Sequence, residues 1–155
     1  MVQEEFVEWR DATVRAFADA QVTAGNWSAD EAFELALRDN SALLPDGFAT
    51  AGMLFLMGVR PDGTSVGHSW VGLTHPRGVP DCAFLYVIEV QEAYRGAGYG
   101  RALLNATEAS VRASGVGALE LNVFGDNTRA IRLYERAGYD VVAQQMRKSL
   151  TADER

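Results

Sequence analysis

The sequence lacks the features that mark several common classes of protein. It contains one cysteine, Cys82, so no disulfide can form within the chain and a cysteine-built metal site is not expected. No apolar run approaches the roughly 20 residues of a membrane-spanning helix, and no basic segment followed by an apolar run opens the chain. We therefore expect no metal and no membrane partner, and a cytoplasmic location.

The sequence also contains few positively charged residues. The 14 lysines and arginines are outnumbered by 21 aspartates and glutamates, which gives a formal net charge of −7. Such a chain repels phosphate backbones and anionic lipids, so we expect no nucleic-acid partner. A cationic partner such as an amine is compatible with this charge. The 155 residues, 48% hydrophobic and 23% charged, fit one globular domain over 1–155.

Hydrophobic spacing and turn residues divide the chain into helices and strands. A capping box, Ser28-Ala29-Asp30-Glu31, is expected to start the second helix. The expected elements are helices over 4–24 and 28–40, strands over 52–60, 66–74 and 83–90, a helix over 98–114, a strand over 118–124, a helix over 127–137 and a last strand over 139–149. This order predicts a mixed α/β sheet with helices on its faces.

A glycine-rich junction carries the clearest chemical signal. The strand over 83–90 is followed, after four residues, by Arg95-Gly96-Ala97-Gly98-Tyr99-Gly100 and then by a helix. Glycines leave backbone N–H groups bare, and a helix start adds unpaired N–H groups with a partial positive charge. The loop therefore predicts a phosphate or pyrophosphate site, although a plain tight connection explains it equally well. The glycine spacing fits neither the dinucleotide fingerprint nor the P-loop.

The spacing Arg95-x-x-Gly98-x-Gly100 fits the Arg/Gln-x-x-Gly-x-Gly/Ala signature of the GCN5-related N-acetyltransferase (GNAT) superfamily. Further along, 127–139 reads Asn-Thr-Arg-Ala-Ile-Arg-Leu-Tyr-Glu-Arg-Ala-Gly-Tyr. This segment resembles the superfamily's Asn-x-x-Ala-x-x-Leu-Tyr-x-x-x-Gly-Phe. Both signatures fall in the superfamily's order and on the expected elements. The chain is further similar to a bacterial subgroup of uncharacterised small acetyltransferases.

This resemblance implies a fold and a cofactor. The implied fold is α/β (α+β), with a mixed, mostly antiparallel central sheet flanked by about four helices. The usual first strand is missing, because only three residues precede the first helix; that strand is absent or lies upstream. The implied cofactor is acetyl-CoA (coenzyme A). Its pyrophosphate is expected on the glycine-rich loop, and its pantetheine arm is expected beside the strand at 88–90. The implied cofactor-binding residues are Ile88, Glu89, Val90, Arg95, Gly96, Ala97, Gly98, Tyr99, Gly100, Arg101, Asn127, Ala130 and Tyr134.

The implied activity is direct transfer of an acetyl group to a primary amine of a small molecule, peptide or protein. The attacking amine must lose a proton, and a partly buried Glu89 is one candidate base. A structural hydrogen bond or salt bridge explains Glu89 equally well, and strand alternation turns it away from the groove unless a bulge intervenes. Asn122 can position water or substrate but is no base, and Glu120 on the same face is an alternative. The Val90 N–H is the expected oxyanion donor, and Tyr134 is expected to protonate the departing thiolate.

Other interpretations stay open. The main alternative is a non-catalytic acyl-CoA-binding or regulatory module on the same fold. A homodimer is also left open. His68 and His75 are expected to be surface residues rather than ligands.

Overall fold

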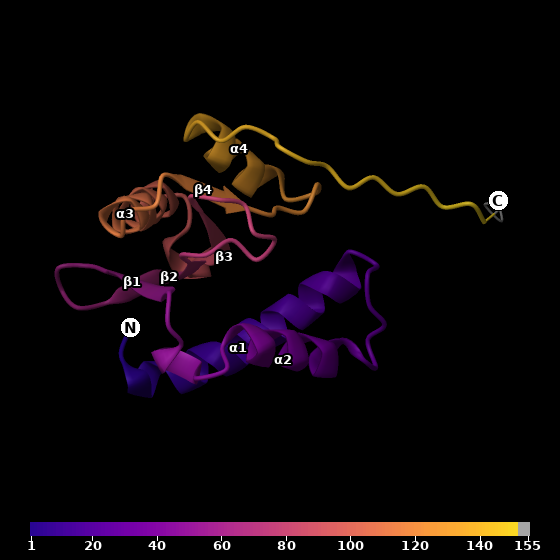
Figure 1. Cartoon of the computed structure of the whole chain (residues 1–155), viewed down its shortest axis with the longest axis horizontal. Helices are drawn as coiled ribbons and strands as arrows, with labels where there is room; N and C mark the ends of the chain where they lie inside the picture. Colours follow the sequence, from indigo (N-terminus) through magenta and orange to yellow (C-terminus); the bar gives the residue numbers. More distant parts are fainter. Residues whose placement is uncertain (152–155) are drawn as a thin grey trace.

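A four-stranded sheet lies at the centre of the structure, a computed structural model that describes residues 1–151 (Figure 1). Its order is β1–β2–β3–β4; β1 to β3 are antiparallel, and β4 is parallel to β3. The elements are α1 (Gln3–Thr23), α2 (Ala32–Leu43), η1 (Gly47–Ala49), β1 (Met53–Val59), β2 (Ser65–Gly72), β3 (Cys82–Val90), η2 (Glu92–Tyr94), α3 (Tyr99–Ala113), β4 (Ala118–Leu121) and α4 (Thr128–Arg136). The predicted mixed, mostly antiparallel sheet with four helices is confirmed. None of the helices in the described part of the chain combines the length and apolarity needed to cross a membrane.

The two faces of the sheet bury different side chains. On one face Val71, Ala83 and Leu85 pack with Leu104 and Val111 of α3. These apolar residues of α3 recur at helical spacing, so the helix buries one stripe against the sheet. The parallel step from β3 to β4 needs such a crossover helix. The N-terminus of α3 consequently lies at the carboxyl end of β3.

The opposite face holds an aromatic cluster. Phe6 and Trp9 of α1 pack with Leu44 and Trp70, and Phe55 of β1 lies beside them. The Trp9 ring meets Trp70 edge-on with centroids 5.7 Å apart, a favourable geometry for aromatic pairs. This cluster fixes α1, and α2 behind it, on the sheet face away from α3.

A β-bulge in β3 changes which side chains face each way. Trp70 pairs with Val87 but Val71 pairs with Leu85, so Tyr86 has no partner in the register. Tyr86 and Val87 both pack in the aromatic cluster, whereas Leu85 packs toward α3. Beyond the bulge the alternation resumes, which places Glu89 on the α1 face together with Val87.

Three expected boundaries are wrong. α2 begins at Ala32 rather than Ser28, because Ser28-Glu31 forms a turn in which the Ser28 hydroxyl lies 3.3 Å from the Glu31 carboxylate. β4 ends at Leu121 instead of 124, where the chain leaves the side of β3. The last expected strand, over 139–149, does not form in the described residues, because no strand lies beside this segment to pair with it.

The close approach of β2 to β3 predicts a strong effect of one glycine. A Cβ at Gly67 would meet the carbonyl oxygen of Glu89 inside any real contact distance, and the Val90 Cα at 3.1 Å. We expect Gly67→Ala to lower the free energy of unfolding by about 1–3 kcal/mol, because the strands must separate. Urea denaturation measures this.

Gly58 of β1 supplies a matched control, because it lies directly opposite Gly67 in the pairing of β1 with β2. A Cβ there would have the Val66 methyl as its nearest neighbour, at 3.4 Å, and would meet no atom more closely. Gly58→Ala should stay within about 1 kcal/mol of the wild type, since the alanine also reduces the entropy of the unfolded chain. Equal effects of the two substitutions would contradict this account of the sheet.

Candidate active site

Strands β3 and β4 separate after a short paired stretch. Their pairing runs from Cys82–Ala118 to Leu85–Leu121 and stops there. β3 continues to Val90 with no strand on that edge among the described residues. The edge from Tyr86 to Val90 is therefore open to an extended ligand, which can pair with it as an added strand.

The direction of the backbone N–H groups supports this use of the edge. The N–H of Gln91 donates to the carbonyl of Val66 at 2.9 Å, so it points toward β2. Successive amides of a strand point to opposite edges. The N–H groups of Val90 and Ile88 consequently point to the open side. Both were expected at the cofactor, and the Val90 N–H was the expected oxyanion donor.

The glycine loop lies at the end of this edge. Gly96 and Gly98 have φ angles of 79° and 87°, in the left-handed region that glycine adopts without strain. Gly98 caps α3 without any side-chain hydrogen bond. Within residues 1–151, no backbone acceptor is found for the N–H groups of 96–101. Six consecutive free donors at a helix start form a site suited to a phosphate group.

Cationic side chains border the loop. Arg95 donates from Nε to the carbonyl of Val90 at 2.9 Å, which ties the loop to the end of β3. Arg101 instead donates to Asn105 along the helix at 3.2 Å. A nitrogen of Arg129, on α4, lies 4.0 Å from the position that a Cβ of Gly96 would take. Arg129 was not among the residues predicted from the sequence, because only the packing of α4 brings it to the loop.

Helix α4 places Tyr134 near the separated strands. Asn127 caps this helix, and its Oδ1 accepts the N–H of Ala130 at 3.2 Å, so that amide is not free for a cofactor. Tyr134 packs against the same apolar cluster as Ile88 and Leu121. Burial raises the pKa of the Tyr134 phenol, and no hydrogen bond contributes to the shift. A phenol is already protonated at neutral pH, and burial shifts it further in that direction, so Tyr134 carries the proton that a donor requires.

Glu89 faces a histidine on the α1 side of the sheet. His68 lies opposite Glu89 on β2, with Nε2 3.9 Å from the nearer carboxylate oxygen. The Glu89 side chain is half-exposed, whereas that of His68 is 19% exposed, and the Trp9 ring meets the imidazole edge-on with centroids 6.0 Å apart. Burial lowers the pKa of His68, and the Glu89 charge partly opposes this. The expectation that His68 is a surface residue was wrong.

The other two candidate polar residues lie on or after β4. Asn122 is exposed and follows the last residue of the strand. Glu120 forms an ion pair with Arg77, and its carboxylate also lies 3.0 Å from Nε2 of His75. Because it is already paired with these groups, Glu120 is poorly suited to act as the base. His75 is buried, which also corrects its expected surface position.

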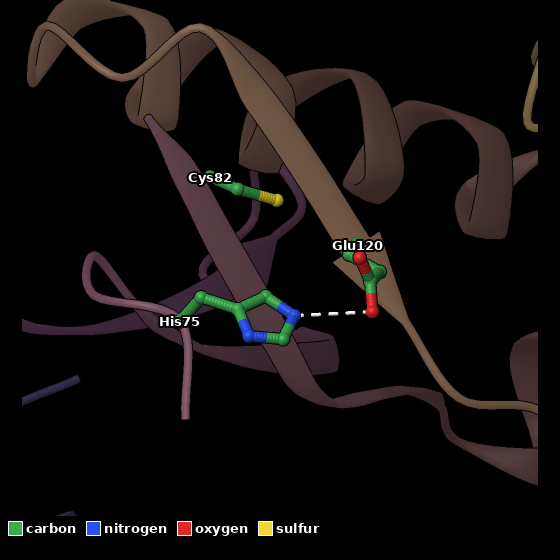
Figure 2. Close-up of side chains that lie close together, drawn as sticks. All are labelled: His75, Cys82 and Glu120. Carbon is green, nitrogen blue, oxygen red and sulfur yellow. Dashed lines mark ion pairs between the residues drawn. The ribbon is translucent and has the colours of Figure 1, made fainter. Parts of the chain in front are cut away.

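His75, Glu120 and Cys82 lie close enough together to resemble metal ligands (Figure 2). However, Nδ1 of His75 accepts the backbone N–H of Arg77 at 3.0 Å, so the neutral ring carries its proton on Nε2. A metal at Nε2 would move that proton to Nδ1, against the Arg77 N–H. Burial also raises the pKa of the Cys82 thiol, which disfavours the thiolate that a metal needs. The cluster is better described as a structural contact: Glu120 pairs with Arg77 and lies beside Nε2 of His75, which holds the loop at 75–77 against β4.

The His68–Glu89 pair predicts an acid-sensitive stability. A pKa below 6.5 in the folded protein means that the unfolded chain binds the proton more tightly. The free energy of unfolding should therefore fall as the pH drops from 6.5 to the pKa that His68 has in the folded protein. An NMR titration of the imidazole should give a pKa under 6.5, and Glu89→Gln should lower it further by removing the opposing charge.

Glu34→Gln, an exposed substitution on α2, is the control and should leave the His68 pKa unchanged. A His68 pKa at or above 6.5, or one that rises in Glu89→Gln, would refute this description of the pair.

Comparisons with known proteins agree with this geometry. A family model described as the acetyltransferase (GNAT) family matches residues 7–139. YdgE of Bacillus subtilis, described as an uncharacterised N-acetyltransferase, is 31% identical over 150 residues, which cover 97% of this chain and 95% of YdgE. The crystal structure of the acetyltransferase YycN from the same species superposes with a TM-score of 0.90 at 31% identity, covering 98% of this chain and 96% of that one.

A mycothiol acetyltransferase of Propionibacterium freudenreichii is 40% identical over 98 residues, which cover 63% of this chain and 30% of that protein. This match is local, whereas YdgE and YycN match along nearly the whole chain. From the family model and these relatives, the chain belongs to the acetyltransferase (GNAT) family.

Proposed function

We propose that the protein transfers an acetyl group from acetyl-CoA directly to a primary amine of a small molecule, peptide or protein. One observation carries this proposal: the open edge of β3, with the N–H groups of Ile88 and Val90 on it, runs into the glycine loop at the start of α3. The relatives described as N-acetyltransferases support the same activity.

The residues of this region fit coenzyme A. The free N–H groups of 96–101 would hold the pyrophosphate, and Arg129 adds a positive charge beside Gly96. The open edge at Ile88 and Val90 would pair with the amide-bearing arm. When bound, acetyl-CoA supplies an activated thioester.

The chain's own groups can then serve direct transfer. The Val90 N–H would donate a hydrogen bond to the carbonyl oxygen of a bound thioester, where negative charge develops. Tyr134, protonated at neutral pH, donates a proton to the departing thiolate. Glu89, half-exposed on the α1 face, takes the proton of the amine through water. Holding the amine beside the thioester supplies much of the remaining acceleration. Asn122, next to the end of β4, positions water or the acceptor.

The acceptor would enter from the side of α1 and α2. Glu89 lies on this face, and its carboxylate attracts an ammonium group before proton loss. Release of free coenzyme A across a panel of amines, amino-terminal peptides and polyamines tests both the activity and the acceptor class. Turnover on at least one amine is expected. Acetyl-CoA binding without turnover on any of them would favour a non-catalytic acyl-CoA-binding module.

A glycine substitution tests the cofactor loop. Gly98 has φ 87° and open space where a Cβ would lie, so Gly98→Ala forces an alanine into the left-handed region at a cost of about 1–2 kcal/mol. Relief of this strain changes the loop that presents the N–H donors. We expect calorimetric titration to show at least about tenfold weaker acetyl-CoA binding, equal to about 1.4 kcal/mol.

Gly115 is the matched control, because it lies at the other end of α3 with φ 83° and equally open space. Gly115→Ala should cause a similar loss of stability with unchanged acetyl-CoA affinity. If both variants bind acetyl-CoA as the wild type does, or if the wild type does not bind it, the cofactor assignment is wrong.

Tyr134→Phe tests the proton donor. Removing the hydroxyl should lower kcat by about a hundredfold, the low end for a positioned general acid, because a thiolate leaves readily. The affinity for acetyl-CoA should change little. Tyr139→Phe is the control: its ring lies 5.7 Å from Tyr134, and its hydroxyl donates to Glu108 at 3.0 Å instead. That variant should lose about 1 kcal/mol of stability and keep its kcat. An unchanged kcat in Tyr134→Phe removes this residue from the mechanism.

A further inference from the structure

The segment that follows α4 runs away from the sheet in an extended conformation (Figure 1). After the turn at Gly138, whose φ is 92°, residues 140–151 form no helix or strand. Their backbone groups make no backbone hydrogen bond with any part of the chain that the structure describes. We call residues 140–150 the C-terminal tail. It is an extended segment without a pairing partner among residues 1–151.

The tail exposes apolar side chains that a single chain leaves in water. Val141, Val142, Met146 and Leu150 are 70%, 75%, 92% and 88% exposed. Soluble monomers rarely leave several large apolar side chains of one segment this exposed, and an extended segment with free N–H and C=O groups is a ready template for strand pairing. The same residues produced the expectation of a strand over 139–149. The tail therefore has the composition of a strand and lacks only a neighbour.

One residue holds the tail away from its own sheet. Arg147 donates to the carbonyl oxygens of Ala24 and Gly25, at 3.1 and 3.4 Å, and to the side chain of Asn26. These groups follow α1, whose last turn has no basic residue of its own. A cation is favoured at this negative end of a helix. The contact keeps the tail extended between α4 and the end of α1.

The sheet has a free edge that matches the tail. β4 pairs with β3 on one side, and no strand in residues 1–151 lies on its other side. Val123 and Phe124, just after β4, are exposed as well. Each chain thus carries an unpaired strand and an unpaired strand edge. A second copy of the same chain satisfies both at once.

We propose that two copies of the protein form a dimer in which the C-terminal tail of each adds as a strand to the free edge of β4 in the other. The exchange is reciprocal, so the assembly closes with two-fold symmetry and leaves neither tail unpaired. Pairing covers the four apolar tail residues and the β4 edge in both copies. The dimer proposal does not rest on the proposed acetyl transfer. Its tests measure mass and cross-links, so they can fail or succeed whatever the activity of the protein.

Light scattering after size exclusion tests the assembly on the full chain. The wild type should have twice the chain mass of 16.9 kDa. The double variant Val142→Glu, Met146→Glu should weaken the dimer by at least about a hundredfold, and show mainly the single-chain mass at about 10 µM. Both side chains are exposed in one chain, so the variant should keep the circular dichroism spectrum of the wild type.

Val7→Glu is the matched control, because Val7 is exposed to a similar extent on α1 and should leave the dimer intact. A wild type of single-chain mass at all concentrations up to about 0.1 mM overturns the proposal. So does a folded double variant that dimerises as tightly as the wild type.

Cross-linking of the unmodified protein tests the exchange itself. Lys148 is the only lysine in the sequence and lies in the tail, so a zero-length carboxyl-to-amine reagent reports the position of the tail directly. In a mixture of ¹⁴N- and ¹⁵N-labelled copies, mass spectrometry should find Lys148 of one copy joined to the peptide holding Glu120 and Asp126 of the other. The exchange is contradicted if Lys148 is joined to that peptide only within one copy. It is also contradicted if the only cross-links between copies join one tail to the other.

Discussion

The separation of β3 from β4 beyond Leu85 and Leu121 is the constraint on which the candidate site depends. Paired strands would satisfy each other's backbone groups and leave no edge for a ligand. Because β4 turns away, the N–H groups of Ile88 and Val90 remain available on β3. The crossover helix α3 begins where β3 ends, so its unpaired amides lie beside the same edge. The groups that can bind a phosphate and the strand edge that can pair with an extended ligand therefore lie next to each other, at the end of β3.

The bulge at Tyr86 determines which face each polar group serves. Without the extra residue, strict alternation from Leu85 would place Glu89 on the α3 face, in the apolar cluster. With it, Glu89 lies opposite His68 on the α1 face, half-exposed. The apolar cluster on the other face receives Tyr134 instead, where burial keeps the phenol protonated. One inserted residue thus separates the proposed base from the proposed acid.

Local patterns in the sequence predicted the parts of the molecule that local forces determine. Apolar runs and helical spacing gave β1 to β3, α1, α3 and α4 to within about two residues, and the glycine loop was placed correctly at the start of α3. The family was also predicted, from the glycine and Asn127–Tyr139 signatures. The roles of the site residues remain predictions, since the structure gives their positions and not their chemistry.

Features that depend on residues far away in the sequence could not be predicted from local patterns. His75, in the loop after β2, is buried beside Glu120 of β4, and the bulge depends on the register with β2. The position of Arg129 depends on how α4 packs. The tail has the apolar residues of a strand, but a strand forms only where a partner lies beside it, and no strand in residues 1–151 lies beside the tail.

Amide hydrogen exchange with and without saturating acetyl-CoA tests the central claim most directly, because it reports on the backbone groups assigned to the cofactor. Acetyl-CoA should slow exchange in peptides that cover 86–90 and 96–101, and leave β1 and the body of α2 unchanged. Saturation with no added protection in either segment, or with protection confined to other parts of the chain, would contradict a cofactor site at the separated strands.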